Sequence, residues 1–326
     1  MMNSPESVFE TMNAMGSNGL PFLFLIDFAC MKPMAVPLGE AAGHGFFYNV
    51  RGLKNIEPVP PATLPSLIFD KNPVEFNTYQ RSFDMVMEGL RFGNSYLLNL
   101  TFPTQIKINR SLEEIFRLGN APYRLLSEDR FVVFSPECFI RITGNTIRSF
   151  PMKGTIDAGL PDASGVLLSD RKEKAEHNTI VDLIRNDLSM VADNVRVERF
   201  RYLEEIRTNQ KHLLQASSEI AGTLTSDWRS KIGTILRTLL PAGSVSGAPK
   251  ASTVEIIRKA EPFQRGFYTG VFGIFDGQML DSAVMIRYIE QKGKHTYYHS
   301  GGGITINSIA EAEYMEMTDK VYVPFI

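Results

Sequence analysis

The sequence has few cysteines and no long uninterrupted apolar segment. Only Cys30 and Cys138 occur among 326 residues, which excludes a disulfide framework and a Cys-x-x-Cys motif and favours a reducing compartment. The longest apolar run, residues 20–31, is too short to span a bilayer and is interrupted by Asp27. No Lys or Arg precedes Lys32, so no secretory signal is predicted. We therefore expect a cytoplasmic protein without a membrane partner.

An excess of charge of either sign is also absent. The sequence contains 34 Lys and Arg and 36 Asp and Glu residues, a net charge of −2, which gives no electrostatic reason to expect nucleic acid as a partner. Hydrophobic residues make up 44% of the chain, as in a globular protein with a large core. No internal repeat with a period of about 20–50 residues is visible, which argues against a solenoid or a propeller.

The apolar pattern predicts clusters of short strands, among them a hairpin over residues 131–150, with helices between the clusters. Such clustering favours an α+β fold built in layers over a doubly wound parallel sheet. The Pro-rich segment 58–65 is the best candidate for a linker. The main helices are expected at residues 4–16, 77–92, 170–187 and 228–240, and the strands at 22–26, 35–37, 46–50, 95–102, 131–134, 138–142, 146–150, 270–275 and 282–289.

The segment 170–187 is the most informative of these helices. On a helix, Glu173 and Glu176 fall on the same side as the apolar residues, where an unpaired charge is costly. A second pair with the same spacing, Glu313 and Glu316, lies near the C-terminus. Residues three apart share one helix surface, and carboxylate oxygens are the ligands that Mg²⁺ prefers. Two inward-facing pairs therefore indicate a cation site.

Two alternatives stand beside the metal hypothesis. Each glutamate pair is also compatible with a solvated helix surface, and Glu316 with a salt bridge to Lys320 one helical turn later. The placement of Glu173 and Glu176 on the apolar side strengthens the cation hypothesis for that pair, and the solvated surface stays open as an equal alternative.

Lys153 and Glu137 are candidates for covalent and acid–base chemistry. Lys153 lies between a proline and a glycine in PMKGT, just after a predicted strand. A lysine held in a rigid turn and partly desolvated can have a lowered pKa and act as a nucleophile. Glu137 stands at a strand break in SPE and becomes a general acid if burial raises its pKa. The alternatives are an ordinary lysine and a turn or capping glutamate.

Further candidate features lie in loops and on one apolar strand. The loop at 244–250, SVSGAPK, does not match the phosphate-loop motif, so no ATP site is predicted. The glycines 301–303 let a ligand approach the backbone or form a flexible turn. Arg287, inside the predicted strand AVMIRYI, requires a substrate carboxylate or a structural acid as partner. His177 and His212 are expected to be satisfied core histidines.

Taken together, these segments resemble the chorismate-utilising enzymes, which include anthranilate synthase component I, aminodeoxychorismate synthase component I, and the isochorismate and salicylate synthases. The similar segments follow the family's order and cover residues 76–326. They are GNSYLLNLT, SPECFIRITGNTIRSFPMKGT, DRKEKAEHNTIVDLIRNDL, LPAGSVSGAPKASTVEIIRKAEP, RGFYTGVFGIFDGQMLDSAVMIR and GGGITINSIAEAEYMEMTDK. The resemblance implies an α/β sandwich of two large antiparallel sheets with helices outside. Residues 1–75 are then a short lead-in packed on the same fold, and residues 76–326 a catalytic domain that binds chorismate.

The resemblance also implies a ligand set. Glu176 and Glu316 would bind Mg²⁺ directly, and Glu173 and Glu313 would assist through water. The metal would neutralise the C1 carboxylate of chorismate. The residues that would bind the enolpyruvyl carboxylate or line the ring pocket are Gly154, Thr155, Tyr268, Arg287, Gly301, Gly302, Gly303 and Lys320.

The reaction that the resemblance implies depends on Lys153. The third residue of PxxGT is usually alanine in anthranilate synthases and lysine in many aminodeoxychorismate synthases. By analogy, Lys153 would attack ring carbon C2 while Glu137 protonates the departing C4 hydroxyl. Ammonia would then add at C4 and expel the lysine, giving 4-amino-4-deoxychorismate. Leu97 stands where the water-adding members have a lysine, which weighs against isochorismate or salicylate synthesis.

A separate glutaminase subunit would supply the ammonia, because no nucleophile and histidine stand at a recognisable amidotransferase spacing. One alternative is anthranilate synthase component I, since His177 gives the sequence AEH that is commoner in those enzymes. The other is a chorismate-binding subunit without activity, prompted by Leu97 and the short N-terminal segment.

Overall fold

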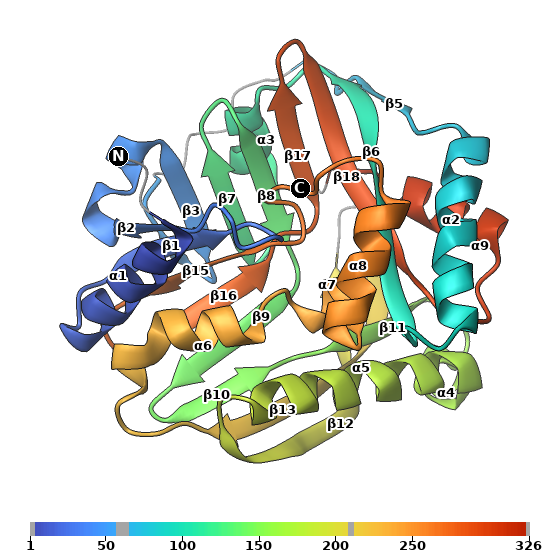
Figure 1. Cartoon of the computed structure of the whole chain (residues 1–326). Helices are drawn as coiled ribbons and strands as arrows, with labels where there is room; N and C mark the ends of the chain where they lie inside the picture. Colours follow the sequence, from blue (N-terminus) through green and yellow to red (C-terminus); the bar gives the residue numbers. More distant parts are fainter. Residues whose placement is uncertain (1–3, 57–64, 208–211, 324–326) are drawn as a thin grey trace.

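Two antiparallel sheets form the centre of the computed structural model, which describes residues 4–56, 65–207 and 212–323 (Figure 1). Sheet A has the order β11 (Met152–Asp157), β13 (His212–Thr223), β10 (Thr146–Ser149), β9 (Cys138–Thr143), β16 (Leu280–Val284), β15 (Val271–Phe275), β1 (Phe22–Ile26) and β2 (Met34–Pro37), with β12 (Asp193–Arg207) paired to β13. Sheet B has the order β14 (Gly247–Ala248), β6 (Leu97–Ile108), β18 (His295–Ile304), β17 (Tyr288–Lys292), β8 (Phe131–Ser135), β7 (Tyr123–Ser127), β3 (Phe46–Val50) and β4 (Leu53–Lys54), with β5 (Phe69–Asn72) paired to β6. The predicted α+β fold with two large antiparallel sheets is confirmed.

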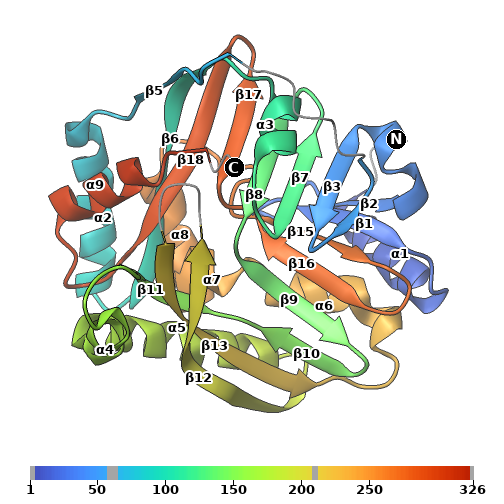
Figure 2. The ribbon, with the colours of Figure 1, turned by 180° about the vertical axis from the view of Figure 1, so that it is seen from behind.

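Helices cover the outer faces of both sheets (Figures 1 and 2). Sheet A carries α1 (Pro5–Ser17), α5 (Arg171–Ser189) and α6 (Ile232–Leu239), whereas sheet B carries α2 (Phe76–Arg91), α3 (Leu112–Leu118), α8 (Lys250–Ala260) and α9 (Ala310–Asp319). The short helices are α4 (Ala163–Ser169), α7 (Gly243–Ser246) and the 3₁₀ turns η1 (Leu38–Glu40), η2 (Ala42–His44) and η3 (Trp228–Lys231). No helix among the described residues is long and apolar enough to cross a membrane.

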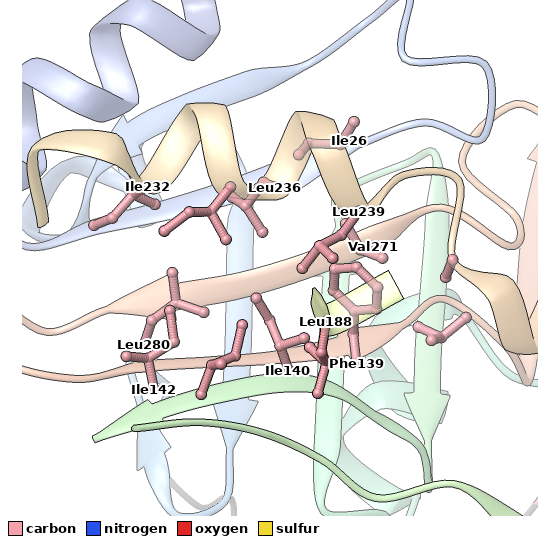
Figure 3. Close-up of a cluster of buried hydrophobic side chains, with 14 of the residues drawn as sticks. Ile26, Phe139, Ile140, Ile142, Leu188, Ile232, Leu236, Leu239, Val271 and Leu280 are labelled. Atoms are coloured by element: carbon pink, nitrogen blue, oxygen red, sulfur yellow. The ribbon is translucent and has the colours of Figure 1, made fainter. Parts of the chain in front are cut away.

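Strand β1 shows why the centre of sheet A has a continuous apolar sequence. Side chains alternate between the two faces of a strand. Phe22, Phe24 and Ile26 pack with the helices outside sheet A, and Leu23 and Leu25 pack between the two sheets. All five residues are buried, so both faces of this strand exclude polar side chains. Figure 3 shows the outer layer of this core, where α6 lies over the strands of sheet A.

Two of the points at which the chain passes from one sheet to the other lie next to each other. Strand β8 lies in sheet B and β9 in sheet A, and the crossing is Pro136–Glu137. Strand β16 lies in sheet A and β17 in sheet B, and the crossing is residues 285–287. Hydrogen bonds join the crossings, from Val284 N to Glu137 O and from Phe134 N to Arg287 O, each 3.2 Å long. The two crossings therefore place Glu137 and Arg287 in the same region of the molecule.

These crossings correct two sequence predictions. The predicted strand 282–289 is two strands in different sheets, and Arg287 adopts a left-handed backbone conformation between them, with φ of 53°. Only the second half of the segment 131–150 is a hairpin, because β9 pairs with β10 whereas β8 pairs in the other sheet.

Two glycine-containing segments predicted as turns lie in strands instead. Lys153 is part of β11, which pairs with β13 through an irregular register near Gly154. The glycines 301–303 lie inside β18 and pair with β6. Both segments are strands because neighbouring backbones complete their hydrogen bonds, a tertiary effect that glycine and proline punctuation does not reveal.

The first 75 residues contribute strands to both sheets, namely β1 and β2 to sheet A and β3, β4 and β5 to sheet B. The division of the chain at residue 75 stays a prediction. The predicted linker at 58–65 lies outside the described residues except for Pro65.

Candidate functional site

A cavity lies next to the two crossings between the sheets. Its wall comes from elements distant in the sequence, because β11 and α5 belong to one side and β18 and the end of α9 to the other. The predicted site residues that line it are Glu137, Lys153, Glu176, Tyr268, Arg287, Gly301, Gly302, Gly303 and Lys320.

Lys153 and Glu176 form an ion pair in this cavity. Lys153 Nζ on β11 lies 2.8 Å from Glu176 Oε2 on α5. Asp170 caps the helix, since its side chain accepts a hydrogen bond from Glu173 N. Burial by itself would lower the pKa of Lys153, but the hydrogen bond and the charge of Glu176 outweigh it and raise that pKa. The expected depression of the Lys153 pKa is therefore wrong for this arrangement, and Lys153 is an ammonium here.

Glu137 is the acidic group at the crossing from β8 to β9. Burial raises the pKa of its carboxyl, and a hydrogen bond donated by Ser244 Oγ to Glu137 Oε1 partly opposes that rise. Ser244 lies on α7, within the segment predicted as a loop. A half-buried carboxyl with a raised pKa meets the condition set from the sequence for a general acid.

Another part of the cavity wall carries positive charge and the backbone of three glycines. Arg287 Nη1 donates to Lys320 O at 2.8 Å, and its guanidinium lies 4.6 Å from the ring centre of Tyr322. Lys320 Nζ donates to Gly301 O at 3.0 Å and lies 2.7 Å from Glu316 Oε1. The expected Glu316–Lys320 salt bridge is thus present. Arg287 has backbone and aromatic neighbours and keeps donor groups for an anion.

The four glutamates of the predicted metal site approach one another around Lys153. Glu173, Glu176 and Glu316 act on the pKa of Lys153, and Lys153 acts on the pKa of Glu313. Burial raises the pKa of both Glu173 and Glu313. Among the described residues, however, no three acidic, histidine or cysteine side chains are gathered closely enough to hold a metal in this arrangement.

The donor set nevertheless fits Mg²⁺. Glu173 Oε2 is buried without a hydrogen-bond partner among the described residues, and a buried carboxylate oxygen in that state favours a cation. Carboxylate oxygens also match the preference of Mg²⁺ for hard ligands. The metal site itself stays a prediction.

Comparison with known proteins identifies the family of this chain. The model of the chorismate binding enzyme family matches residues 47–325. The chain belongs to this family. An uncharacterized PabA-like protein of Haemophilus influenzae is 54% identical over 319 residues, which are 98% of this chain and 97% of that protein.

Relatives with assigned activities are more distant. Anthranilate synthase component 1 of Arthrobacter globiformis is 36% identical over 220 residues, 64% of this chain and 39% of that one. Aminodeoxychorismate synthase component 1 of Bacillus subtilis is 28% identical over 265 residues, 77% and 55% of the two chains. This chain therefore spans about half or less of these longer enzymes.

The fold of this chain is similar to that of a solved structure. MenF, the menaquinone-specific isochorismate synthase of Escherichia coli, superposes with a TM-score of 0.74 at 17% identity and covers 98% of this chain and 81% of that structure.

Five of the predicted residues lie outside the cavity lining of this chorismate-binding enzyme. Thr155 is exposed on β11, and the space beside Gly154 is filled by Glu173, whose Oε2 would be 3.1 Å from an added Cβ. Glu313 packs beside Gly302 and accepts a hydrogen bond from Ser308. These five residues are Gly154, Thr155, Glu173, Glu313 and Glu316.

Several polar residues that line the cavity were not predicted from the sequence. What they share is a buried polar atom without a hydrogen-bond partner among the described residues, which is unusual in a folded protein. They are Asn99, Tyr298, His299 and Ser300. Three of them directly precede the glycines of β18, so a prediction of Gly301–Gly303 as part of a strand would have drawn attention to them.

The two predicted core histidines differ in the structure. His177 is buried, with Nδ1 3.3 Å from Lys153 O and Nε2 2.7 Å from Ser218 Oγ, so it is a satisfied core histidine as predicted. His212 is exposed at the start of β13, with Nε2 3.2 Å from Glu205 Oε2. The prediction for His212 is wrong because the start of β13 is exposed, and the strand becomes buried only from Ala216 onward.

Proposed function

We propose that this chain is the synthase component that converts chorismate and ammonia into 4-amino-4-deoxychorismate, the precursor of para-aminobenzoate in folate synthesis. The observation that carries the proposal is the position of Lys153 on the cavity wall of a chorismate-binding enzyme, with the half-buried acid Glu137 lining the same cavity. The family resemblance assigns a nucleophilic lysine to the members that aminate C4.

In this proposal, two different sets of residues bind the two carboxylates of the substrate. Arg287, Tyr268 and the backbone amides of Gly301–Gly303 bind the enolpyruvyl carboxylate, and Lys320 adds positive charge nearby. Glu173, Glu176, Glu313 and Glu316 hold Mg²⁺, which supplies neutralisation of the ring carboxylate when bound. The cavity thus fixes the ring with its C2 and C4 carbons toward the reactive residues.

The chemical step exchanges an oxygen for a nitrogen in two displacements. Lys153 attacks C2, the ring double bond shifts, and the C4–O bond breaks as Glu137 protonates the departing hydroxyl to water. Ammonia then forms a bond to C4, and the C2–nitrogen bond to Lys153 breaks. Dividing one difficult displacement into two easier ones is the advantage of covalent catalysis. A lysine attacks only as a neutral amine, so the ion pair with Glu176 has to open first.

Ammonia has to come from another source, and we assign its release to a separate glutaminase subunit. Release of ammonia from glutamine usually requires a reactive thiolate. Burial raises the pKa of Cys30 to about 11 and that of Cys138 to about 12. Both thiols are therefore protonated at neutral pH, and neither is suited to attack glutamine.

The decisive experiment is mass spectrometry of the products that the purified chain forms from chorismate, Mg²⁺ and excess ammonium. The expected product is 4-amino-4-deoxychorismate with its enolpyruvyl group intact. Anthranilate together with pyruvate would contradict the proposal. Unchanged chorismate, also after a glutaminase subunit is added, would contradict it in favour of a chorismate-binding subunit without activity.

Anthranilate synthase component I is the second candidate because of the 36% identical relative and the sequence AEH at His177. His177, however, is buried against Lys153 O and Ser218 and does not line the cavity. His177 can influence the product only indirectly, through its contact with the backbone of Lys153. Lys153 itself lines the cavity in which the substrate is proposed to bind. Lys153 is therefore the better guide to the reaction.

A further inference from the structure

His299 is a buried histidine of the cavity wall that the proposed reaction does not use. It lies on β18, two residues before Gly301, and is only 1% exposed. Its Nε2 lies 2.6 Å from Glu290 Oε1 on β17, whereas Nδ1 has no hydrogen-bond partner among the described residues. Because a carboxylate only accepts hydrogen bonds, Nε2 carries a proton and Nδ1 is the free position of the ring.

The charges around His299 come from several elements. Glu290 and Lys292 on β17 and Glu261 after α8 act on its pKa. Burial lowers the pKa of His299, and Glu290 opposes this effect only in part. The surroundings are otherwise aromatic, since the ring centre of Tyr268 is 5.1 Å away and that of Tyr288 is 5.5 Å away. These surroundings lower the pKa of His299 and favour the neutral imidazole at pH 7.

A neutral imidazole nitrogen without a partner is costly inside a protein. His299 is a residue of the cavity lining, and its ring packs against that of Tyr268, which the family resemblance assigns to the enolpyruvyl carboxylate. Glu290, on the side of Nε2, is already in place to balance a positive charge on the ring. A group that arrives at Nδ1 with negative charge would therefore complete the site.

We propose that His299 is a further substrate-binding residue, which takes up a proton from solvent when a substrate carboxylate enters and donates its Nδ1–H to that carboxylate. This inference rests on the proposed function, since it names chorismate as the dicarboxylate. Glu290 is a positioning residue in this arrangement, because it sets the proton on Nε2 and leaves Nδ1 toward the ligand. No bond between heavy atoms forms or breaks, and the proton is the only species transferred.

The proposal has a direct thermodynamic consequence. Only the protonated imidazole binds the carboxylate well, so the affinity for chorismate falls as the pH rises above the pKa of His299 in the empty cavity. Isothermal titration calorimetry of chorismate, without ammonium and in two buffers of different ionisation enthalpy, measures the number of protons taken up. We expect the wild type to take up more protons than His299→Gln, with the difference approaching one.

Steady-state kinetics gives an independent readout. His299→Ala is expected to raise KM for chorismate roughly tenfold or more at pH 6.5, as for the loss of a hydrogen bond to a charged group, with little change in kcat. His299→Gln keeps a neutral donor and is expected to regain part of the affinity, with a KM that depends less on pH. His295→Gln is the matched control, because His295 lies exposed on the same strand and contacts Gln105.

The outcomes separate this inference from the proposed function. If wild type and His299→Gln take up the same number of protons and share one pH profile of KM while both turn over chorismate, His299 is not a substrate ligand and the proposed function stands. If folded wild type fails to bind chorismate, both proposals fall. Circular dichroism and the unfolding temperature establish that each variant is folded.

Discussion

Lys153 Nζ and Glu176 Oε2 lie 2.8 Å apart, so the proposed nucleophile and a proposed metal ligand neutralise one another before anything binds. The pairing explains how a lysine and several carboxylates coexist in a half-buried place, since a buried charge without a partner is costly. The ammonium group of Lys153 is therefore the cation that Glu176 binds in this structure. A metal ion that bound the same carboxylate would displace this ammonium group and break the ion pair.

Replacement of Lys153 by alanine is expected to slow amination on the order of 10³-fold or more, as for other residues that act as nucleophiles. Intact-protein mass spectrometry after mixing with chorismate should detect a covalent adduct in the wild type and none in the variant. Lys172→Ala is the control, because Lys172 is mostly exposed and lies 3.9 Å from Glu176 Oε1. Wild-type turnover in Lys153→Ala would rule out the covalent mechanism.

Removal of the Ser244 hydroxyl is expected to change the pH dependence of the reaction. The hydroxyl donates to the carboxylate and stabilises its ionised form, so Ser244→Ala raises the pKa of Glu137 further. Glu137 has to be protonated to act as an acid, and the basic limb of the kcat/KM profile should therefore move to higher pH. Ser252→Ala, which alters an exposed hydroxyl bonded to backbone oxygens, should leave the profile unchanged. A shift to lower pH in Ser244→Ala would contradict the assignment.

Glu316→Gln tests the proposed metal site. The variant loses one carboxylate charge and is expected to need a roughly tenfold or higher Mg²⁺ concentration for half-maximal activity. Activity measured as a function of Mg²⁺ provides the comparison, and Glu311→Gln, on the exposed part of α9, serves as control. If both variants respond to Mg²⁺ like the wild type, Glu316 does not bind the metal.

The glycines of β18 are expected to differ in their effect on stability. An added Cβ at Gly301 would lie 2.6 Å from Leu100 O and from Thr101 Cγ2, whereas at Gly302 its nearest neighbour is Glu313 Oε2 at 3.4 Å. Gly301→Ala is therefore expected to lower the free energy of unfolding by about 1–3 kcal/mol, the range for an overpacked position. Gly302→Ala should cost clearly less. Denaturant-induced unfolding of the two variants measures the difference, and equal losses would contradict this reasoning.

Helix ends and apolar strands were predictable because their signals are local. The N-cap Ser4 with Pro5 marks the start of α1, and Ser111 and Glu114 form a capping box at the start of α3. The side of α5 that carries Glu173 and Glu176 also followed from helical spacing, and Glu176 does reach the cavity.

The crossings between the sheets were not predictable from local patterns. AVMIRYI has no glycine or proline at the point where the chain leaves sheet A, and the break appears only in the backbone of Arg287. The pKa of Lys153 was predicted in the wrong direction for a similar reason. Burial by itself lowers it, and the partner that raises it, Glu176, comes from a helix that the sequence does not place beside β11.

The paired crossings at Glu137 and Arg287 also bear on the order in which the protein becomes active during its synthesis. The hydrogen bonds between them join the middle of the chain to its last sixth. A nascent chain that has not been synthesised as far as Arg287 already contains the acid Glu137. It still lacks Arg287 and the later residues that line the same cavity. Contacts of such long sequence separation form late, so a substrate-sized pocket arises only once nearly the whole protein has been made.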